Sequence, residues 1–274
     1  MPELPSTDLV LTSFDDGVLS LTLNRPERRN ALSGATLDQI EAVVEVVKDD
    51  LDVRALVIRG SAGIFCAGGD LKDFGDIAAG GDPDRAAVAR MNRRFGDIFE
   101  LLLDTGAVVV AVVEKAAIGG GFGLASIADV VIAEPTATFA MTETTLGLVP
   151  AQIAPIVARR LGVVPAQRLA ITGARLKTPE AATAGLVDIV ADDVDAALAD
   201  VLAGIRRCAP AANAATKRLM GQLGTMPLTD LLDVAAESFT DAILGDEAAA
   251  GIGAFLTKGT PPWAATDATT DGDA

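Results

Sequence analysis

Residues 107–124 read AVVVAVVEKAAIGGGFGL, an apolar run followed by three consecutive glycines and then by more apolar residues. A short apolar run bounded by turn residues is typical of a buried strand. The three glycines allow a tight turn, and a helix that starts there would present amide N–H groups without helical acceptors. This stretch therefore predicts a strand, a tight loop and a helix in succession, which is the building unit of an α/β fold.

The same alternation extends to both sides of this stretch. Strands are expected over residues 10–14, 18–23, 55–59, 130–133, 137–140 and 186–190, and helices from Ser33, over 86–103, from Thr178 and throughout the chain beyond Val194. Asp16-Gly17 between the first two strands predicts a hairpin. We therefore expect an α/β core over residues 1–195, a helical region over 196–265 and a disordered acidic tail over 266–274. No internal sequence repeat is evident.

Composition excludes several classes of function. Half of the 274 residues are hydrophobic, so a sizeable core is expected, and the net charge is −16. Nucleic-acid and anionic-membrane partners are not expected, because both require clustered basic residues. With two distant cysteines, no recognisable signal peptide and no apolar run long enough for a bilayer, a cytoplasmic location is expected.

The chain contains no histidine and no tyrosine. Catalytic triads that use histidine and histidine metal sites are therefore excluded, and no metal is expected. Proton transfer in an enzyme of this composition must use a carboxylate, a lysine or a cysteine, assisted by backbone N–H groups.

Two glycine loops and one glutamate are the candidates for such chemistry. Residues 65–72 read FCAGGDLK, in which Asp70 can cap a following helix and Gly69 would present its N–H at that helix start. Gly120 lies in the second loop, and Glu143 has small, apolar or hydroxylic neighbours. Taken singly, the loops equally fit ordinary turns and Glu143 a surface glutamate. Together, two N–H groups and a carboxylate can stabilise an enolate beside a thioester.

These residues resemble the crotonase (enoyl-CoA hydratase/isomerase) superfamily, and the resemblance covers nearly the whole chain. The matching segments are residues 23–26, 30–32, 65–72, 118–121, 128–133, 137–140, 143, 146–150, 172–173, 184–187, 254–258 and 263. The resemblance implies a spiral of ββα units with a C-terminal helical region that forms trimers, often paired into hexamers. It also implies coenzyme A thioester substrates and no separate cofactor.

The resemblance also implies roles for individual residues. The N–H groups of Gly69 and Gly120 would form the oxyanion hole, and Glu143 would transfer protons. The residues expected near coenzyme A are Arg28, Arg29, Ala67, Lys72, Phe239, Phe255 and Lys258. The basic side chains equally fit solvated surface charges, and the two phenylalanines equally fit helix packing.

One departure from the family pattern leaves the reaction open. Members with two catalytic glutamates carry the first just after the triple glycine, where this chain has Gly123. Members that keep only the second glutamate include double-bond isomerases and a hydratase branch that acts on branched glutaconyl-type CoA esters. The stretch from Glu143 to Pro155 resembles the latter, with Gln152 able to bond substrate or water or to serve only as a helix-start residue. Hydration is the first expectation, isomerisation the second, and acyl-CoA binding without turnover the third.

Overall fold

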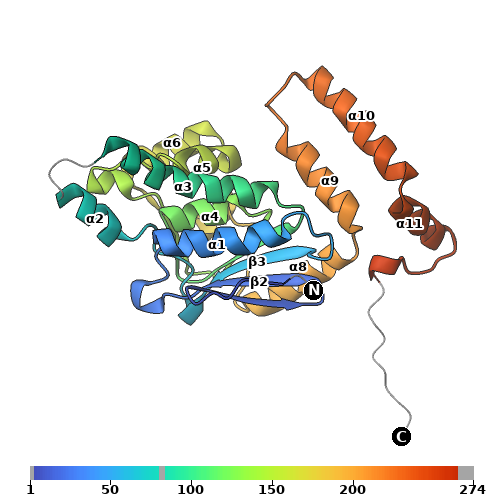
Figure 1. Ribbon diagram of the computed structural model, residues 1–274, viewed down its shortest axis with the longest axis horizontal. Coiled ribbons are helices and arrows are strands. Elements are labelled where there is room, and N and C mark those ends of the chain that lie inside the picture. The colour runs from blue at the N-terminus through green and yellow to red at the C-terminus, as the bar shows by residue number, and fades with distance from the viewer. Residues whose placement is uncertain (1–2, 80–83, 265–274) are drawn as a thin grey trace, which may run out of the picture. The chain divides into compact units, whose positions relative to one another are not determined.

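The computed structural model describes residues 3–79 and 84–264, with elements labelled in Figure 1. The expected acidic tail over 266–274 lies outside these residues. The chain forms two compact units, residues 1–199 and 200–274, and each is described by itself. No described helix is long and apolar enough to cross a membrane.

A six-stranded sheet forms the base of the first unit. Its strands, in spatial order, are β1 (Val10–Asp15), β2 (Val18–Leu23), β3 (Ala55–Gly60), β4 (Val108–Val113), β6 (Val130–Ala133) and β9 (Ile189–Val190). β1 and β2 are antiparallel, and every other neighbouring pair is parallel. Asp16 and Gly17 both have positive φ, which confirms the hairpin predicted from Asp-Gly. The predicted last strand is shorter than expected and begins only at Ile189.

A second, three-stranded sheet contains β5 (Ala116–Ile118), β7 (Thr138–Ala140) and β8 (Arg175–Lys177). β4 continues almost directly into β5, and β6 leads to β7, so the strands from β4 to β7 belong alternately to the two sheets. A helical segment follows each such pair, which is the ββα spiral that the resemblance implied. Only β7 of this second sheet was expected from the sequence, because strands of three residues carry too little periodicity to be recognised.

The helices of the first unit are α1 (Gly34–Val47), α2 (Leu71–Ala79), α3 (Arg85–Asp104), α4 (Gly120–Ile127), α5 (Ile153–Leu161), α6 (Val163–Thr172) and α7 (Thr178–Thr183). The Ser33 side chain accepts from the Thr36 N–H and caps α1, as predicted. Thr178 is the first residue of α7, where the sequence predicts a helix to begin, and its hydroxyl donates to the Glu134 carbonyl.

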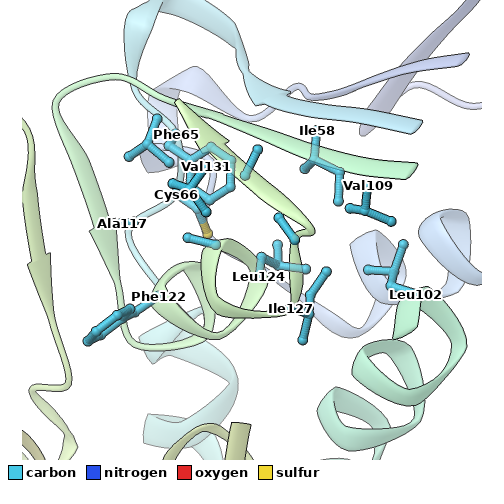
Figure 2. Close-up of a cluster of buried hydrophobic side chains, with 14 of the residues drawn as sticks. Ile58, Phe65, Cys66, Leu102, Val109, Ala117, Phe122, Leu124, Ile127 and Val131 are labelled. Atoms are coloured by element: carbon cyan, nitrogen blue, oxygen red, sulfur yellow. The ribbon is translucent and has the colours of Figure 1, made fainter. Parts of the chain in front are cut away.

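The core of the first unit surrounds α4, in which every residue is buried. Figure 1 shows α1, α3 and α4 on the same side of β2 and β3. Figure 2 shows Leu124 and Ile127 of α4 beside Val109 of β4 and Leu102 of α3. A short helix enclosed in this way has its start held firmly by packing on all sides.

The second unit consists of helices. α8 (Val194–Arg206) leads into it, and α9 (Pro210–Gly221), α10 (Leu228–Leu244), α11 (Asp246–Leu256) and a short turn, η4 (Pro262–Ala264), follow. The Glu247 carboxylate accepts from the N–H groups of Ala211 and Ala212, and the Trp263 indole donates to the Arg207 carbonyl. Leu231 is the one buried residue of α10, so most of this helix is exposed.

Candidate active site

The loop after β3 is held between two neighbouring segments. Cys66 pairs with Ala117 of β5, and Gly69 pairs with Leu32 just before α1. The Leu32 N–H donates to the Gly68 carbonyl at 2.8 Å, and the Leu32 carbonyl accepts from the Asp70 N–H at 2.9 Å. Leu32 thus bonds to the two residues on either side of Gly69. In a parallel pairing of this kind, the N–H of the residue between the two bonded ones points away from the opposite strand. The Gly69 N–H is therefore directed away from Leu32, and it has no acceptor among the described residues.

The second glycine loop places another free N–H beside the first loop. Gly119 has φ 52° and ψ −119°, a conformation that favours glycine, and its N–H donates to the Ala140 carbonyl at 2.8 Å. Gly120 begins α4, and its N–H has no acceptor in the described part of the chain. A Cβ on Gly68 would lie 3.0 Å from the Ile118 carbonyl oxygen, so the two loops are in contact.

One aromatic side chain connects the two glycines. The Phe95 ring of α3 lies 3.5 Å from the position of a Cβ on Gly69 and 3.4 Å from that of a Cβ on Gly120. Phe95 is buried and belongs to the same core as α4. The two N–H groups therefore sit on rigid backbone next to a common apolar wall, which suits them to hold one oxygen atom.

Glu143 completes this arrangement. It follows β7 at the start of the turn η3 (Glu143–Leu146), and its Oε1 would lie 2.6 Å from a Cβ on Gly119. The same Cβ would be 3.6 Å from the Gly68 Cα, so the carboxylate and both loops meet at Gly119. Only a glycine leaves room there for the carboxylate.

The environment of Glu143 favours its protonated form. The side chain is half-buried, and its Oε2 is enclosed without a hydrogen-bond partner among the described residues. Burial raises the pKa of the Glu143 carboxyl above its ordinary value, and the amides of Thr142 and Glu143 oppose this shift. A carboxyl whose pKa is raised is better suited to accept a proton in one step and to return it in the next. The Cys66 thiol is fully buried with a pKa raised to about 12, so it is no candidate base.

The position of the missing glutamate is occupied by an aromatic ring. A Cβ on Gly123 would lie 2.4 Å from the Phe99 Cζ, and Phe99 is fully buried in α3. The space that another side chain at 123 would need is therefore filled. In this conformation, Glu143 is the carboxylate that meets the two glycine loops.

The residues expected near coenzyme A fall into two groups. The Ala67 N–H donates to the carbonyl of Arg29, and the Lys72 N–H donates to the Asp70 side chain. Arg28 is close enough for its charge to contribute to lowering the Asp70 pKa, an effect led by the Arg25 hydrogen bond. The structure thus brings Arg28, Arg29, Ala67 and Lys72 together beside the first glycine loop, with the three basic side chains exposed.

The other group lies in the second unit. Phe239 of α10 and Phe255 of α11 are 68% and 83% exposed, and Lys258 follows α11 with a positive φ of 55°. Exposure of both rings argues against helix packing within this unit as their role.

Sequence reasoning left two features of the site unassigned and the role of Gln152 open. Arg25 belongs to one of the segments that resemble the family, but no role was predicted for it. Its guanidinium donates to the Ala31 carbonyl at 2.6 Å and to the Asp70 carboxylate at 2.8 Å, and these bonds stabilise the first loop. Phe95 and Phe99 were part of a helix expected only from its periodicity, and their contacts with the glycines depend on tertiary packing. Gln152 directly precedes α5, its side chain makes no capping bond, and its Nε2 donates to Asn92 Oδ1 at 3.0 Å. Nowhere in the described ranges do three or more potential ligands gather in a group that could hold a metal.

The sequence matches the enoyl-CoA hydratase/isomerase family over residues 13–266. This chain belongs to that family. Pseudomonas aeruginosa AtuE is 46% identical, with a TM-score of 0.90 and coverage of 94% of this chain and all of AtuE. An enoyl-CoA hydratase/isomerase from Marinobacter aquaeolei is 40% identical, also with a TM-score of 0.90, over 94% of this chain and 99% of the other. The 2,3-dehydroadipyl-CoA hydratase of Escherichia coli is 32% identical over 92% of this chain and 97% of its own length.

Membership in this family confirms the resemblance seen in the sequence, and the fold of these relatives agrees with the ββα spiral. The chain is therefore a member of an enzyme family whose named homologues are hydratases and isomerases of acyl-CoA thioesters.

Proposed function

We propose that this protein catalyses the reversible addition of water to a 2-enoyl-CoA thioester. The observation that carries the proposal is the meeting of three groups at Gly119: the loop with the Gly69 N–H, the loop with the Gly120 N–H, and the half-buried Glu143 carboxylate. The two N–H groups would bind the thioester oxygen and stabilise the negative charge that develops there.

Glu143 would transfer the protons of this reaction. Its carboxylate accepts a proton from water while the water oxygen adds to C3, and the resulting enolate is held by Gly69 and Gly120. Protonation at C2, from Glu143 or from solvent, completes the addition. The raised pKa suits this role, because the group must be ionised at one stage and protonated at the next.

Double-bond isomerisation is the second candidate, and Phe99 is the observation that favours it. With the space beside Gly123 filled, one carboxylate serves the site. An isomerase needs only the oxyanion hole and one base that moves a proton between C2 and C4. We rank hydration first because the stretch from Glu143 to Pro155 resembles the single-glutamate hydratase branch. An acyl-CoA-binding protein without turnover is the third candidate.

For the substrate, we propose a short enoyl-CoA of the branched glutaconyl type. The relative from E. coli is named for 2,3-dehydroadipyl-CoA, an enoyl-CoA that also derives from a dicarboxylic acid. Coenzyme A would enter only as part of the substrate, with Arg28, Arg29 and Lys72 offsetting the net charge of −16 near its phosphates.

We also propose that the second unit assembles this chain into a homotrimer or a hexamer. The support is the large number of exposed apolar side chains on its helices. We also propose a cytoplasmic location, on the ground that a chain with only two cysteines, far apart in the sequence, is typical of a reducing compartment.

The reaction can be tested in deuterated water with crotonyl-CoA, 3-methylglutaconyl-CoA and a 3-enoyl-CoA, read by mass spectrometry. We expect a gain of one water on the first two substrates and loss of this activity in Glu143→Gln. Double-bond migration without water addition would replace hydratase by isomerase. Tight acyl-CoA binding without any turnover would favour the binding protein.

A further inference from the structure

A pair of carboxamides lies beside the proposed oxyanion hole, on the same face of α3 as Phe95. Asn92, Phe95, Gly96 and Phe99 follow one another at helical spacing along this face. Phe95 contacts the positions of both oxyanion-hole glycines, so Asn92 is placed about one helical turn, roughly 5 Å, from that contact. This separation matches the length of a short acyl chain.

Gln152 contacts this face through a direct hydrogen bond, and the absence of a side chain at Gly96 leaves room for its amide. Its Nε2 donates to Asn92 Oδ1 at 3.0 Å, and its Oε1 would lie 2.3 Å from a Cβ on Gly96. Any larger residue at 96 would displace the amide. Gln152 occupies the N-cap position directly before α5, yet its side chain makes no capping bond. A simple helix-start role therefore does not explain its position.

Most of the polar groups of Asn92 and Gln152 that are still free to form hydrogen bonds are N–H donors. Asn92 Oδ1 accepts the bond from Gln152 Nε2, which leaves two N–H groups on Asn92 and one on Gln152 as donors. Against these three, Gln152 Oε1 lies beside Gly96 as an acceptor with no hydrogen bond from the described residues. Asn92 Nδ2 has no hydrogen-bond partner among the described residues and is not one of the enclosed unsatisfied atoms, so the Asn92 donors reach accessible space. Several convergent N–H donors fit a carboxylate, which offers about four acceptor positions.

The charged groups nearby do not supply this function already. Arg93 also lies over Gly96, but its guanidinium is exposed and paired with Asp97 at 2.9 Å and Glu100 at 2.7 Å. The neutral amides are therefore the donors that remain for a ligand.

We propose that the Asn92–Gln152 pair binds a carboxylate at the far end of the acyl chain and so selects enoyl-CoA esters derived from dicarboxylic acids. The inference rests on the proposed function for the location of the thioester, and it names the residues that determine which acyl chain is preferred. The amides would act on binding and specificity, while Glu143 and the two glycines act on the reacting atoms.

The test measures binding of two unreactive ligands, glutaryl-CoA and butyryl-CoA, by calorimetry. The wild-type protein should bind glutaryl-CoA more tightly. Gln152→Glu replaces an N–H donor by a negative charge of similar shape. We expect the ratio of the affinity for glutaryl-CoA to that for butyryl-CoA to fall about tenfold or more, because a hydrogen bond to a charged group is lost. Gln167→Glu, an equal charge change on the exposed surface of α6, should leave the ratio unchanged.

Asn92→Asp is the second variant, and it should lower the same ratio if Gln152→Glu does not fold. Equal binding of the two ligands by the wild-type protein would overturn the proposal, as would variants that weaken both ligands by the same factor. Hydration of crotonyl-CoA by the wild-type protein is measured separately. If the protein prefers glutaryl-CoA but does not hydrate crotonyl-CoA, the proposed hydratase activity is wrong and the Asn92–Gln152 site stands. If it hydrates crotonyl-CoA but does not prefer glutaryl-CoA, only the Asn92–Gln152 site is wrong.

Discussion

At the scale of single residues, Glu143 carries an energetic cost that its proposed role explains. Its Oε2 is enclosed without a partner among the described groups, and burial raises its pKa. An unpaired buried polar atom destabilises a fold by about 1–3 kcal/mol when fully enclosed. A site that keeps such an atom free leaves it available to water or substrate.

The pH dependence of Glu143 has a defined sign. Because its pKa is higher in the folded chain than in the unfolded chain, the folded state binds the proton more tightly. The contribution of the Glu143 carboxyl to the free energy of unfolding is therefore greatest below its pKa in the unfolded chain, near 4.5. This contribution is lost as the pH rises through the pKa of the folded chain. We therefore expect Glu143→Gln to be more stable than wild type at pH 7, by on the order of 1 kcal/mol, with the difference shrinking at pH 4.

The same substitution should lower kcat by about 10²–10⁴-fold, the usual contribution of a general acid or base. Urea unfolding at the two pH values and steady-state hydration of crotonyl-CoA are the measurements. A variant that hydrates crotonyl-CoA at the wild-type rate would show that Glu143 is not the proton-transfer group.

At the scale of elements, the packing of α3 against α4 decides what the site can contain. Phe95 forms the wall beside Gly69 and Gly120, Gly96 admits Gln152, and Phe99 fills the space beside Gly123. One helix face therefore shapes the oxyanion hole, the proposed acyl subsite and the position of the absent glutamate.

Gly123→Ala should destabilise the protein. The new Cβ would lie 2.4 Å from the fully buried Phe99 ring, and such overpacking costs about 1–3 kcal/mol, only partly offset by the higher helix propensity of alanine. Gly34→Ala is the matched control, because a Cβ at the start of α1 meets no atom within 4 Å.

Denaturant unfolding measures both variants, and Phe99→Leu should recover part of the loss in the Gly123→Ala background. Wild-type stability in Gly123→Ala would contradict the tight α3–α4 contact. For the same steric reason, we expect Gly123→Glu alone not to create a working pair of glutamates.

At the scale of the whole molecule, the two units differ in how their apolar side chains are covered. In the first unit, most large apolar side chains are buried around α4. In the second unit, helices α10 and α11 expose Leu228, Leu232, Phe239, Leu244, Phe255 and Leu256. Exposed apolar residues on one unit are typical of association surfaces.

If the second unit assembles the chain, the mass in solution should be three or six times the 27.9 kDa of one chain. Light scattering coupled to size exclusion measures this mass. Leu244→Asp, at a side chain 81% exposed, should shift the protein toward smaller species, because a charge at an apolar interface is costly to bury. Leu11→Asp on the exposed face of β1 is the control, and a monomeric wild type would contradict the proposed assembly.

The α/β class, the family, the hairpin at Asp16-Gly17 and the cap at Ser33 could all be predicted from the amino-acid sequence. Each depends on local chemistry: apolar periodicity, turn residues and short motifs act within a few neighbouring positions. The two glycine loops and Glu143 were also recognisable as candidates, because their residue types are unusual in that order.

How these segments contact one another depends on tertiary packing. The small strands β5 and β8 exist because they pair with β7, and Gly69 presents its N–H because Leu32 bonds both of its neighbours. Phe99 fills the space beside Gly123, and Gln152 reaches Asn92 across 60 residues of chain. Contacts of this kind arise from packing between elements distant in sequence, where local propensity carries no information.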